Sequence, residues 1–506
     1  MKKATTETCC LTLPLKVEKW QNDRLGKRLE IARQIYNTLL GFELKKFKRL
    51  KESSEYIDVV SKIVNSENNS VENKQYKKIL GKMRMDAGFS EYAFMTDMKP
   101  FYKHFSDNIG SSVAVHCIAK QVWQAFDSLL FGKGREIHFK RKGDFCSVKG
   151  GSVTGKSGGR EIIFKGSYVE WKGLKLPVKI DKKNDYEQEM IQKRVKYCRI
   201  IKKLGKNKNH WYVQLTLEGN PAVKVNRKTG EIRHPINKGA VGIDIGPQTI
   251  AYVSDREVGL KELADKVNNI EREKRIIMRK MDRSRRAMNP DNYNEDGTIK
   301  RGVKLTRNKS KRYLKLQREL AYLQFQQSEI RKRQHNELAN HLLSLGNEIY
   351  VEDMDWQCLA KRSKNTEVSE KTGKYKRKKR FGKSIGNKAP ATLLTLIDLK
   401  LKSRGYGGIT KVPTSVRASQ YNHLLDEYKK KSLSERWNYM SDGKKIQRDL
   451  YSAFLLQHVD MESVSFDKKG LKLDYKNFVK MHDECIEELK NQPKIITSMG
   501  IVRRAS

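Results

Sequence analysis

The sequence has no long apolar segment and no paired cysteines. Its 506 residues contain no run of about 18 apolar residues, and the stretch after Met1 lacks the apolar core of a signal peptide. We therefore expect a soluble cytoplasmic protein without a membrane partner. The seven cysteines form an odd set with no C-x-x-C pair, so we expect neither a disulfide framework nor a zinc site.

Acidic residues are also scarce relative to basic ones. Lys and Arg number 105 against 59 Asp and Glu, which gives a formal net charge of +46, and apolar residues make up only 37% of the chain. A charge of this size repels itself in the folded state unless a polyanion neutralises it. Nucleic acid is the polyanion that fits a chain without membrane-binding segments.

The N-terminal half alternates between helical and strand-like patterns. Residues 8–16 have the alternation of a strand, residues 23–49 have apolar side chains at helical spacing, and the polar stretch 51–75 predicts a loop. Short apolar runs broken by glycine between 135 and 219 predict a small antiparallel β-barrel. The strand at 8–16 can pair into that barrel, which would make the helical block an insertion.

The C-terminal half has the pattern of an α/β domain. A near-continuous apolar strand is predicted over 240–253 and a second one over 348–351, with two long helices between them. The helices carry heptad-like seams, which predict a helical hairpin over 258–346. Residues 361–383 are rich in Lys and Arg without an apolar period, so we expect a basic loop there.

Three acids stand where apolar elements end or begin. Asp244 lies within the first apolar strand, Glu352 ends the second, and Asp449 opens an amphipathic helix. Each has an ordinary structural explanation as a cap or a strand-end residue. Glu352 also shares its stretch with Asp353 and Asp355, so spacing alone does not choose between these acids.

Together, the three acids predict a metal site. Two acids on neighbouring strands and one on an abutting helix can converge on a pair of Mg²⁺ ions, with Mn²⁺ as a substitute, because these ions prefer oxygen ligands. Two such ions about 3.5–4 Å apart bind the attacking water and the leaving oxygen in phosphodiester hydrolysis. We therefore predict that Asp244, Asp449 and one acid of the stretch that contains Glu352, Asp353 and Asp355 are catalytic residues and metal ligands.

The chain resembles the transposon-encoded TnpB nucleases and the compact type V CRISPR effectors over nearly its whole length. Asp244 in Gly-Ile-Asp-Ile-Gly, Glu352 in Val-Glu-Asp-Met and Asp449 in Gln-Arg-Asp-Leu-Tyr-Ser-Ala-Phe-Leu match the three acids of the family's RuvC nuclease domain. Less generic segments agree, namely Val122 to Phe126, Ile137 to Arg141, Phe381 to Ser384 with Ala389-Pro390, and Ala418 to Tyr421 with Leu433 to Arg436.

The resemblance implies a multidomain α+β protein. A wedge-type β-barrel with a helical recognition insertion would precede an RNase H-like (RuvC) α/β nuclease domain that contains the helical hairpin. The corresponding ranges are 1–20 and 110–239 for the wedge barrel, 21–109 for the recognition lobe, 240–404 and 446–506 for the nuclease domain, and 405–445 for a segment that loads the target strand.

One departure from the family concerns zinc. The family usually has a zinc ribbon of paired C-x-x-C motifs between the second and third acids, whereas the segment from Gly405 to Lys445 contains no cysteine. Zinc is therefore not expected, and aromatic residues are the candidates for holding this segment together: Tyr421, Tyr428, Trp437 and Tyr439.

Basic residues near aromatic ones, and along the first hairpin helix, are candidates for nucleic-acid binding. Phe47 and Phe139 stand within such clusters, although core packing is the commoner role of an aromatic side chain. A surface ion pair is an equal alternative for Arg436 and Arg448. The predicted nucleic-acid-binding residues are Lys45, Lys46, Lys48, Arg49, Lys140, Arg141, Arg275, Arg279, Arg283, Arg286, Arg436 and Arg448.

The resemblance implies an RNA-guided DNA endonuclease, whose partners are a guide RNA and double-stranded target DNA. The guide would read the sequence by base pairing and the protein a short flanking motif. A homodimer on one RNA would compensate for a small recognition lobe, and DNA binding would place the protein at the nucleoid. The alternatives are an RNA-guided repressor that binds without cutting, and an unguided transposase or resolvase-type nuclease.

Overall fold

The computed structural model describes residues 6–111, 113–131, 134, 136–150, 161–206, 208–361, 368, 373, 381–432 and 434–503. The chain divides into two compact units, one up to Val223 and one from Lys224 onward, each with several helices and sheets. Both units are mixed α/β structures. Most of the predicted basic loop at 361–383 lies outside the described residues.

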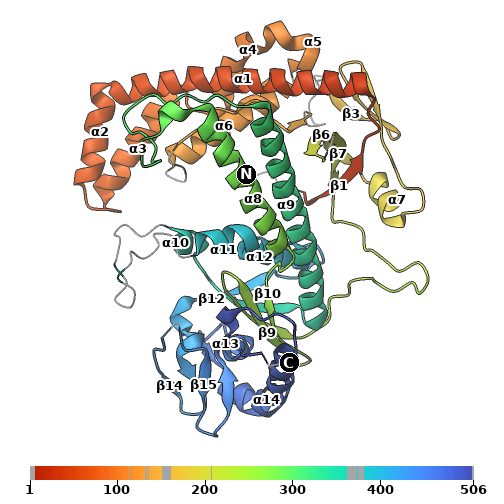
Figure 1. Ribbon diagram of the computed structural model, residues 1–506, viewed down its shortest axis with the longest axis vertical. Coiled ribbons are helices and arrows are strands. Elements are labelled where there is room, and N and C mark those ends of the chain that lie inside the picture. Colours follow the sequence, from red (N-terminus) through yellow and green to blue (C-terminus); the bar gives the residue numbers. More distant parts are fainter. Residues whose placement is uncertain are drawn as a thin grey trace. The chain divides into compact units, whose positions relative to one another are not determined.

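The first unit is built on one long helix and two small sheets (Figure 1). The four-stranded sheet has the order β1-β7-β6-β2, and the three-stranded sheet has the order β3-β4-β5. The strands are β1 (Thr8–Pro14), β2 (Ser147–Lys149), β3 (Ile162–Phe164), β4 (Tyr168–Trp171), β5 (Leu174–Pro177), β6 (Val195–Leu204) and β7 (Asn209–Glu218). The helices are α1 (Lys19–Glu52), α2 (Ser54–Asn65), α3 (Val71–Asp86), α4 (Glu91–Tyr102), α5 (Ser106–Ile109), a π-helix (Val113–Ile118), α6 (Ala119–Leu130) and α7 (Asp185–Gln192).

The N-terminal strand pairs as predicted. β1 lies antiparallel to β7, from Thr8 opposite Glu218 to Pro14 opposite Tyr212, so the helical block is inserted between two strands of one sheet. Alternation buries Cys9 and exposes Cys10. The two sheets are linked by a bridge between the residues after β1 and β5, at 15 and 178, and full barrel closure stays a prediction.

The predicted loop at 51–75 is wrong. It contains α2 and the start of α3, because Ser53 and Ser70 cap these helices by accepting hydrogen bonds from the backbone N–H groups of Tyr56 and Asn73. The two helices enclose a small apolar cluster of their own. The few buried residues in this pair explain why hydrophobic periodicity did not predict it.

The second unit is built around a five-stranded sheet with the order β10-β9-β8-β11-β12. β9 is antiparallel to both β8 and β10, whereas β11 runs parallel to both β8 and β12. The strands of this sheet are β8 (Ala240–Ile245), β9 (Thr249–Ser254), β10 (Val258–Glu262), β11 (Glu348–Glu352) and β12 (Ile409–Val412). Three short hairpins follow in the chain: β13 (Tyr421–Asn422) with β14 (Glu427–Tyr428), β15 (Trp437–Tyr439) with β16 (Lys445–Gln447), and β17 (Val459–Asp460) with β18 (Ser465–Phe466).

Helices cover both faces of this sheet. The end of α9 and α12 pack on the face that carries Val241, Ile243 and Ile349. α13 and α14 pack on the opposite face, against Ala251 and Val253. The helices are α8 (Val267–Met288), α9 (Lys311–Leu345), α10 (Trp356–Ala360), α11 (Gly382–Lys388), α12 (Pro390–Lys402), α13 (Arg448–Gln457) and α14 (Lys468–Lys490).

Two sequence predictions in this unit need correction. The apolar stretch 240–253 is not one strand, because the chain turns between β8 and β9. The hairpin helices begin at Val267 rather than at 258, since Leu260 belongs to β10 and both Leu260 and Leu263 are buried against the sheet. From Ile270 onward the predicted seam holds, and α8 and α9 run side by side around Ile277 and Leu323 (Figure 1).

Candidate metal and nucleic-acid site

Asp244 and Glu352 lie on neighbouring parallel strands. β8 and β11 pair up to Ile243 opposite Val351, so Asp244 and Glu352 are the next residues on the two strands. Because side chains alternate between faces, these two carboxylates lie on the face opposite Ile243 and Val351. Both acids are half-buried.

A glycine allows α13 to lie against this face. A Cβ atom on Gly242 would stand 2.0 Å from the carbonyl oxygen of Ala453 and 2.4 Å from the backbone nitrogen of Gln457. Only a residue without a side chain permits this approach of strand and helix. α13 begins with Arg448-Asp449, so its close packing on β8 brings Asp449 toward Asp244.

The three acids interact electrostatically. Burial is the main cause that raises the pKa of Asp244, and the negative charges of Asp449 and then Glu352 raise it further. A hydrogen bond with Ser452 and the charge of Arg448 oppose this rise. Burial also raises the pKa of Glu352. The carboxylates are thus close enough to repel one another.

The acids that neighbour Glu352 are engaged elsewhere. Asp353 Oδ1 lies 2.8 Å from Lys411 Nζ in an exposed ion pair. Asp355 caps α10 by accepting hydrogen bonds from the backbone N–H groups of Gln357 and Cys358, both at 2.9 Å. Of the three acids in this stretch, Glu352 is the one whose charge acts on Asp244.

Two arginines and a glutamine surround Asp449. Arg436 Nη1 lies 3.7 Å from Asp449 Oδ2, Arg448 Nε lies 3.4 Å from Asp449 Oδ1, and Gln447 Nε2 donates to Asp449 Oδ2 at 3.3 Å. The side chains of Arg436 and Arg448 are 29% and 12% exposed. Both arginines therefore stand beside the acids rather than at a remote surface position.

The donor set suits a hard divalent cation. Carboxylate oxygens are the ligands that Mg²⁺ and Mn²⁺ prefer, and a cation would relieve the repulsion felt by Asp244. Within the described ranges, no three His, Cys, Asp or Glu side chains already form a closed metal-binding group. The acids are thus neighbours that would draw together on a cation.

Aromatic residues organise the segment that lacks cysteines. Tyr421 stacks on Phe466 with ring centroids 4.6 Å apart, and Trp437 Nε1 donates to the carbonyl oxygen of Gly500 at 2.8 Å. Tyr428 and Tyr439 contribute less to this packing, because they are 54% and 77% exposed. Two of the four predicted aromatic residues therefore hold the segment against the rest of the unit.

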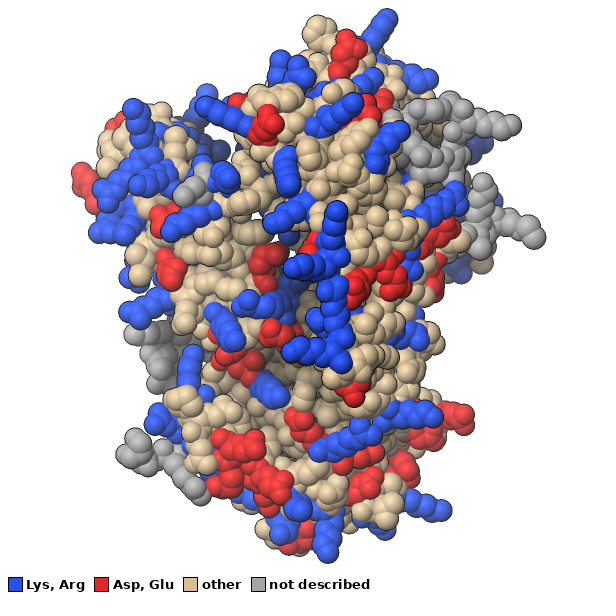
Figure 2. Space-filling model, turned by 90° about the vertical axis from the view of Figure 1, so that its right-hand side faces the viewer, with Lys and Arg blue, Asp and Glu red and all other residues tan. Residues whose placement is uncertain are grey.

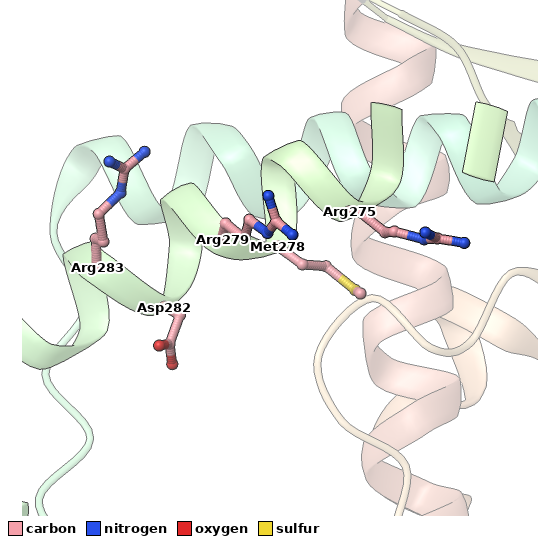
Figure 3. A pocket seen from close by; sticks show the side chains of 5 residues that line it. All are labelled: Arg275, Met278, Arg279, Asp282 and Arg283. Carbon is pink, nitrogen blue, oxygen red and sulfur yellow. The ribbon is translucent and has the colours of Figure 1, made fainter. Parts of the chain in front are cut away.

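The predicted arginines on α8 form an exposed row. Arg275, Arg279 and Arg283 are exposed and follow one another at four-residue spacing, so they lie about one turn apart on the helix. Figure 3 shows their guanidinium groups extending from α8, with Met278 and Asp282 beside them. This row is available to phosphate groups.

Arg286 has protein partners. Its Nε lies 3.0 Å from Asp282 Oδ2, its Nη1 donates to the carbonyl oxygen of Gly297 at 2.9 Å, and its guanidinium covers the ring of Tyr293. These contacts tie α8 to the tip of the hairpin. The residue is therefore less free to bind phosphate than Arg275 or Arg279.

Lys46 also has protein partners. Its Nζ lies 2.9 Å from Asp97 Oδ2 and 3.3 Å from Glu43 Oε2, and Glu43 is fully buried. Phe47 is buried in an aromatic cluster with Phe89, so it packs in the core instead of offering a stacking surface. One side of this part of α1 therefore packs in the core and contacts other protein residues instead of offering a surface to nucleic acid.

The opposite side of α1 and the segment after α6 stay basic and accessible. Lys45, Lys48, Arg49 and Arg141 are exposed, while Lys140 is half-buried with its Nζ over the ring of Tyr36. Phe139 is 52% exposed, as a stacking side chain would be. Figure 2 shows Lys and Arg side chains over the whole visible face, with Asp and Glu between them.

Sequence reasoning missed three residues that shape the acid site, namely Gly242, Gln447 and Ser452. Gly242 is a glycine inside an apolar strand, which is a sequence signal for close backbone approach. Gln447 directly precedes the Arg-Asp pair, but its partners lie 35 and 52 residues further along the chain. No local pattern could have predicted those partners.

The sequence matches no family model and no curated protein. Among solved structures, the chain is similar to one in a "Cas12f1-sgRNA-target DNA complex", with a TM-score of 0.39 and 12% identity over 88% of this chain and 98% of the other. It is also similar to one in a "CRISPR-Cas12f Ternary Complex", with a TM-score of 0.22 and 12% identity over 89% and 99% of the two chains. Both scores lie below 0.5, so neither comparison establishes a shared fold.

In the described part of the chain, helices are either too short or too polar to cross a membrane.

Proposed function

We propose that the protein is an RNA-guided DNA endonuclease that hydrolyses phosphodiester bonds at Asp244, Glu352 and Asp449. The observation that carries this proposal is the approach of three carboxylates from β8, β11 and α13, with repulsion that raises the pKa of Asp244. Like charges gathered at one place destabilise a fold unless a cation offsets them. A chain with a net charge of +46 that keeps such a cluster is suited to cations placed among phosphates.

The acids and the arginines of the site have different proposed roles. Asp244, Glu352 and Asp449 would hold two Mg²⁺ ions, which activate water and stabilise the leaving oxygen when bound. Arg436 and Arg448 lie next to Asp449 and would bind the phosphate of the DNA strand, because a guanidinium matches phosphate geometry. Neither zinc nor another cofactor is part of this proposal.

The guide RNA is proposed on the resemblance of the sequence motifs to TnpB nucleases and compact type V effectors. The exposed lysines and arginines of α1 and of α8 support a nucleic-acid partner, since they are accessible to phosphate groups. The wedge, recognition and nuclease assignments, binding of double-stranded target DNA, a homodimer on one RNA and a cytoplasmic, nucleoid-associated location belong to the same proposal.

One observation favours a second candidate, an RNA-guided protein that binds DNA without cutting it. Asp449 is paired with Arg436 and Arg448, and ion pairs are one way in which a binding protein would neutralise an acid that no longer holds a metal. At Asp244, by contrast, a hydrogen bond with Ser452 and the charge of Arg448 only partly offset the burial and the neighbouring acids that raise its pKa. That difference makes cleavage the better-supported function.

RNA content separates the guided functions from an unguided nuclease. The protein is purified from cells that carry its native locus, and bound RNA is sequenced after extensive nuclease treatment of the free RNA. A discrete protected RNA is expected. A random sample of cellular RNA would leave an unguided transposase or resolvase-type nuclease as the better account.

A further inference from the structure

Gln447 is the most completely engaged polar side chain at the acid site. It is fully buried, and its amide makes three hydrogen bonds. Nε2 donates to Asp449 Oδ2 at 3.3 Å and to the carbonyl oxygen of Met499 at 3.2 Å, while Oε1 accepts from the backbone N–H of Leu450 at 2.8 Å.

These partners fix the orientation of the amide. Asp449 and the carbonyl group of Met499 can only accept, and the backbone N–H of Leu450 can only donate. A flipped amide would face two acceptors with its oxygen and a donor with its NH₂ group. Gln447 therefore presents an N–H group to Asp449 in every arrangement that keeps its other two bonds.

The backbone of Gln447 is anchored as well. Its N–H donates to Nε2 of the buried His482 at 3.0 Å, and His482 Nδ1 lies 2.9 Å from Asp483 Oδ1. Because Nε2 accepts this bond, the ring proton resides on Nδ1 and points to Asp483. α14 thus fixes the residue that contacts Asp449.

The segment after α14 packs against Gln447 and Arg436. Met499 is buried, and a Cβ on Gly500 would stand 2.3 Å from Cβ of Arg436, which shows how closely this backbone lies against that arginine. Trp437 donates to the carbonyl oxygen of Gly500. One short C-terminal segment therefore supports both Gln447 and Arg436, two residues that contact Asp449.

Helix capping alone does not require glutamine here. Ser, Thr, Asp and Asn are the preferred N-cap residues, and they accept the helix N–H with a shorter side chain. The extra length of Gln447 serves the second contact, in which its amide reaches Asp449. Partners of this kind hold metal ligands in the orientation that binds the ion.

We propose that Gln447 is a positioning residue that orients the Asp449 carboxylate for a divalent cation, and that His482 and the Met499 segment hold Gln447 in place. This inference rests on the metal site of the proposed function. It adds a specific claim: Asp449 depends on a buried amide, not only on its place in α13.

Mn²⁺ binding to the full chain without nucleic acid tests the claim apart from cleavage. Free Mn²⁺ is followed by electron paramagnetic resonance. The Mn²⁺ binding that is lost in Asp449→Asn is the part that depends on this carboxylate. Gln447→Asn keeps a good helix cap but shortens the amide, whereas Gln447→Met removes every hydrogen bond of the side chain. Each should weaken Asp449-dependent Mn²⁺ binding by about 10- to 100-fold, the usual effect of losing such a partner.

Gln457→Met is the matched control. Gln457 is a buried glutamine at the other end of α13, and its Nε2 donates to Asp255 at 2.5 Å rather than to an acid of the site. This variant should bind Mn²⁺ as the wild type does. If Gln447→Met fails to fold, Gln447→Asn carries the test, with thermal unfolding as the check on its integrity.

The outcomes separate positioning from capping and from the nuclease proposal. Wild-type Mn²⁺ affinity in Gln447→Asn would overturn the inference, because capping would then be the whole role. Wild-type affinity in Asp449→Asn would overturn it too, since Asp449 would not be a ligand. Weaker binding in the Gln447 variants, together with no DNA cleavage by the wild type, would support positioning and refute the nuclease.

Discussion

Replacing Gly242 by alanine should push α13 away from β8. The added Cβ would lie 2.0 Å from the carbonyl oxygen of Ala453, whereas ordinary contact begins at 3.4 Å, so the backbones must separate by about 1.4 Å. Both contacts are with backbone atoms, the carbonyl oxygen of Ala453 and the nitrogen of Gln457, which cannot rotate away as a side chain would. Overpacking of this kind costs about 1–3 kcal/mol of unfolding free energy.

The same shift should affect catalysis more than stability. α13 carries Asp449, and a misplacement of about 1 Å in a catalytic constellation can lower a rate by about 100-fold. We expect Gly242→Ala to remain folded in thermal unfolding and to lose about two orders of magnitude in single-turnover cleavage of matched DNA. The rate is measured at saturating Mg²⁺, so that weaker ion binding is not the cause.

The second glycine of the same motif is the control. A Cβ on Gly246 would meet the hydroxyl of Thr249 at 3.5 Å, an ordinary contact, so Gly246→Ala should cut DNA at close to the wild-type rate. Equal rates for Gly242→Ala and the wild type would contradict this prediction. They would show that the distance between β8 and α13 does not set the position of Asp449.

Three further predictions concern charge. Asp244→Asn should raise the melting temperature at pH 7 in EDTA, and the gain should vanish near pH 4, because the raised pKa of Asp244 lets the carboxyl ionise more readily in the unfolded chain than in the fold once pH exceeds its usual 3.8. Burial raises the pKa of Glu43 to about 8, so Glu43 should contribute to a fall in wild-type stability as pH rises from 4.5 toward 8, and Glu43→Gln should make that fall smaller; an unchanged pH profile would exclude Glu43 as a contributor. Joint replacement of Arg275, Arg279 and Arg283 by glutamine should lower the salt slope of duplex DNA binding by about 2.7, as expected for three lost phosphate contacts, and an unaltered slope in fluorescence anisotropy would exclude this row from the interface.

Sequence periodicity predicted the elements that bury much apolar surface. β1 alternates as expected, and the seam of α8 and α9 lies where heptad-like spacing predicted it from Ile270 onward. Periodicity was misleading where the apolar residues of a strand and of the following helix have the same spacing. Leu260 and Leu263 continue the helical seam in sequence, yet the chain uses them to pack a β-hairpin and the turn after it.

Capping residues would have corrected one error. Ser53 and Ser70 are the N-cap residues of α2 and α3, within a stretch whose polarity predicted a loop. Such helices bury little surface, so their caps are a stronger local signal than their apolar residues.

The approach of the three acids could be inferred from strand and helix order, because strands in parallel register end at one edge of a sheet. The contacts that support Asp449 could not be inferred from the sequence. Gln447, His482 and Met499 meet only through packing of the C-terminal residues on α13. Tertiary contacts between residues so far apart have no periodic trace in the sequence.

Cleavage by the purified protein with its own RNA is the most direct test of the proposed function. DNA that matches the copurified RNA is incubated with the complex in Mg²⁺ or in EDTA, and Asp244→Ala, Glu352→Ala and Asp449→Ala complexes are run beside it. We expect Mg²⁺-dependent cutting of matched DNA only, abolished in all three variants while DNA binding persists. Cutting that survives these substitutions, or tight guided binding without any cutting, would contradict it.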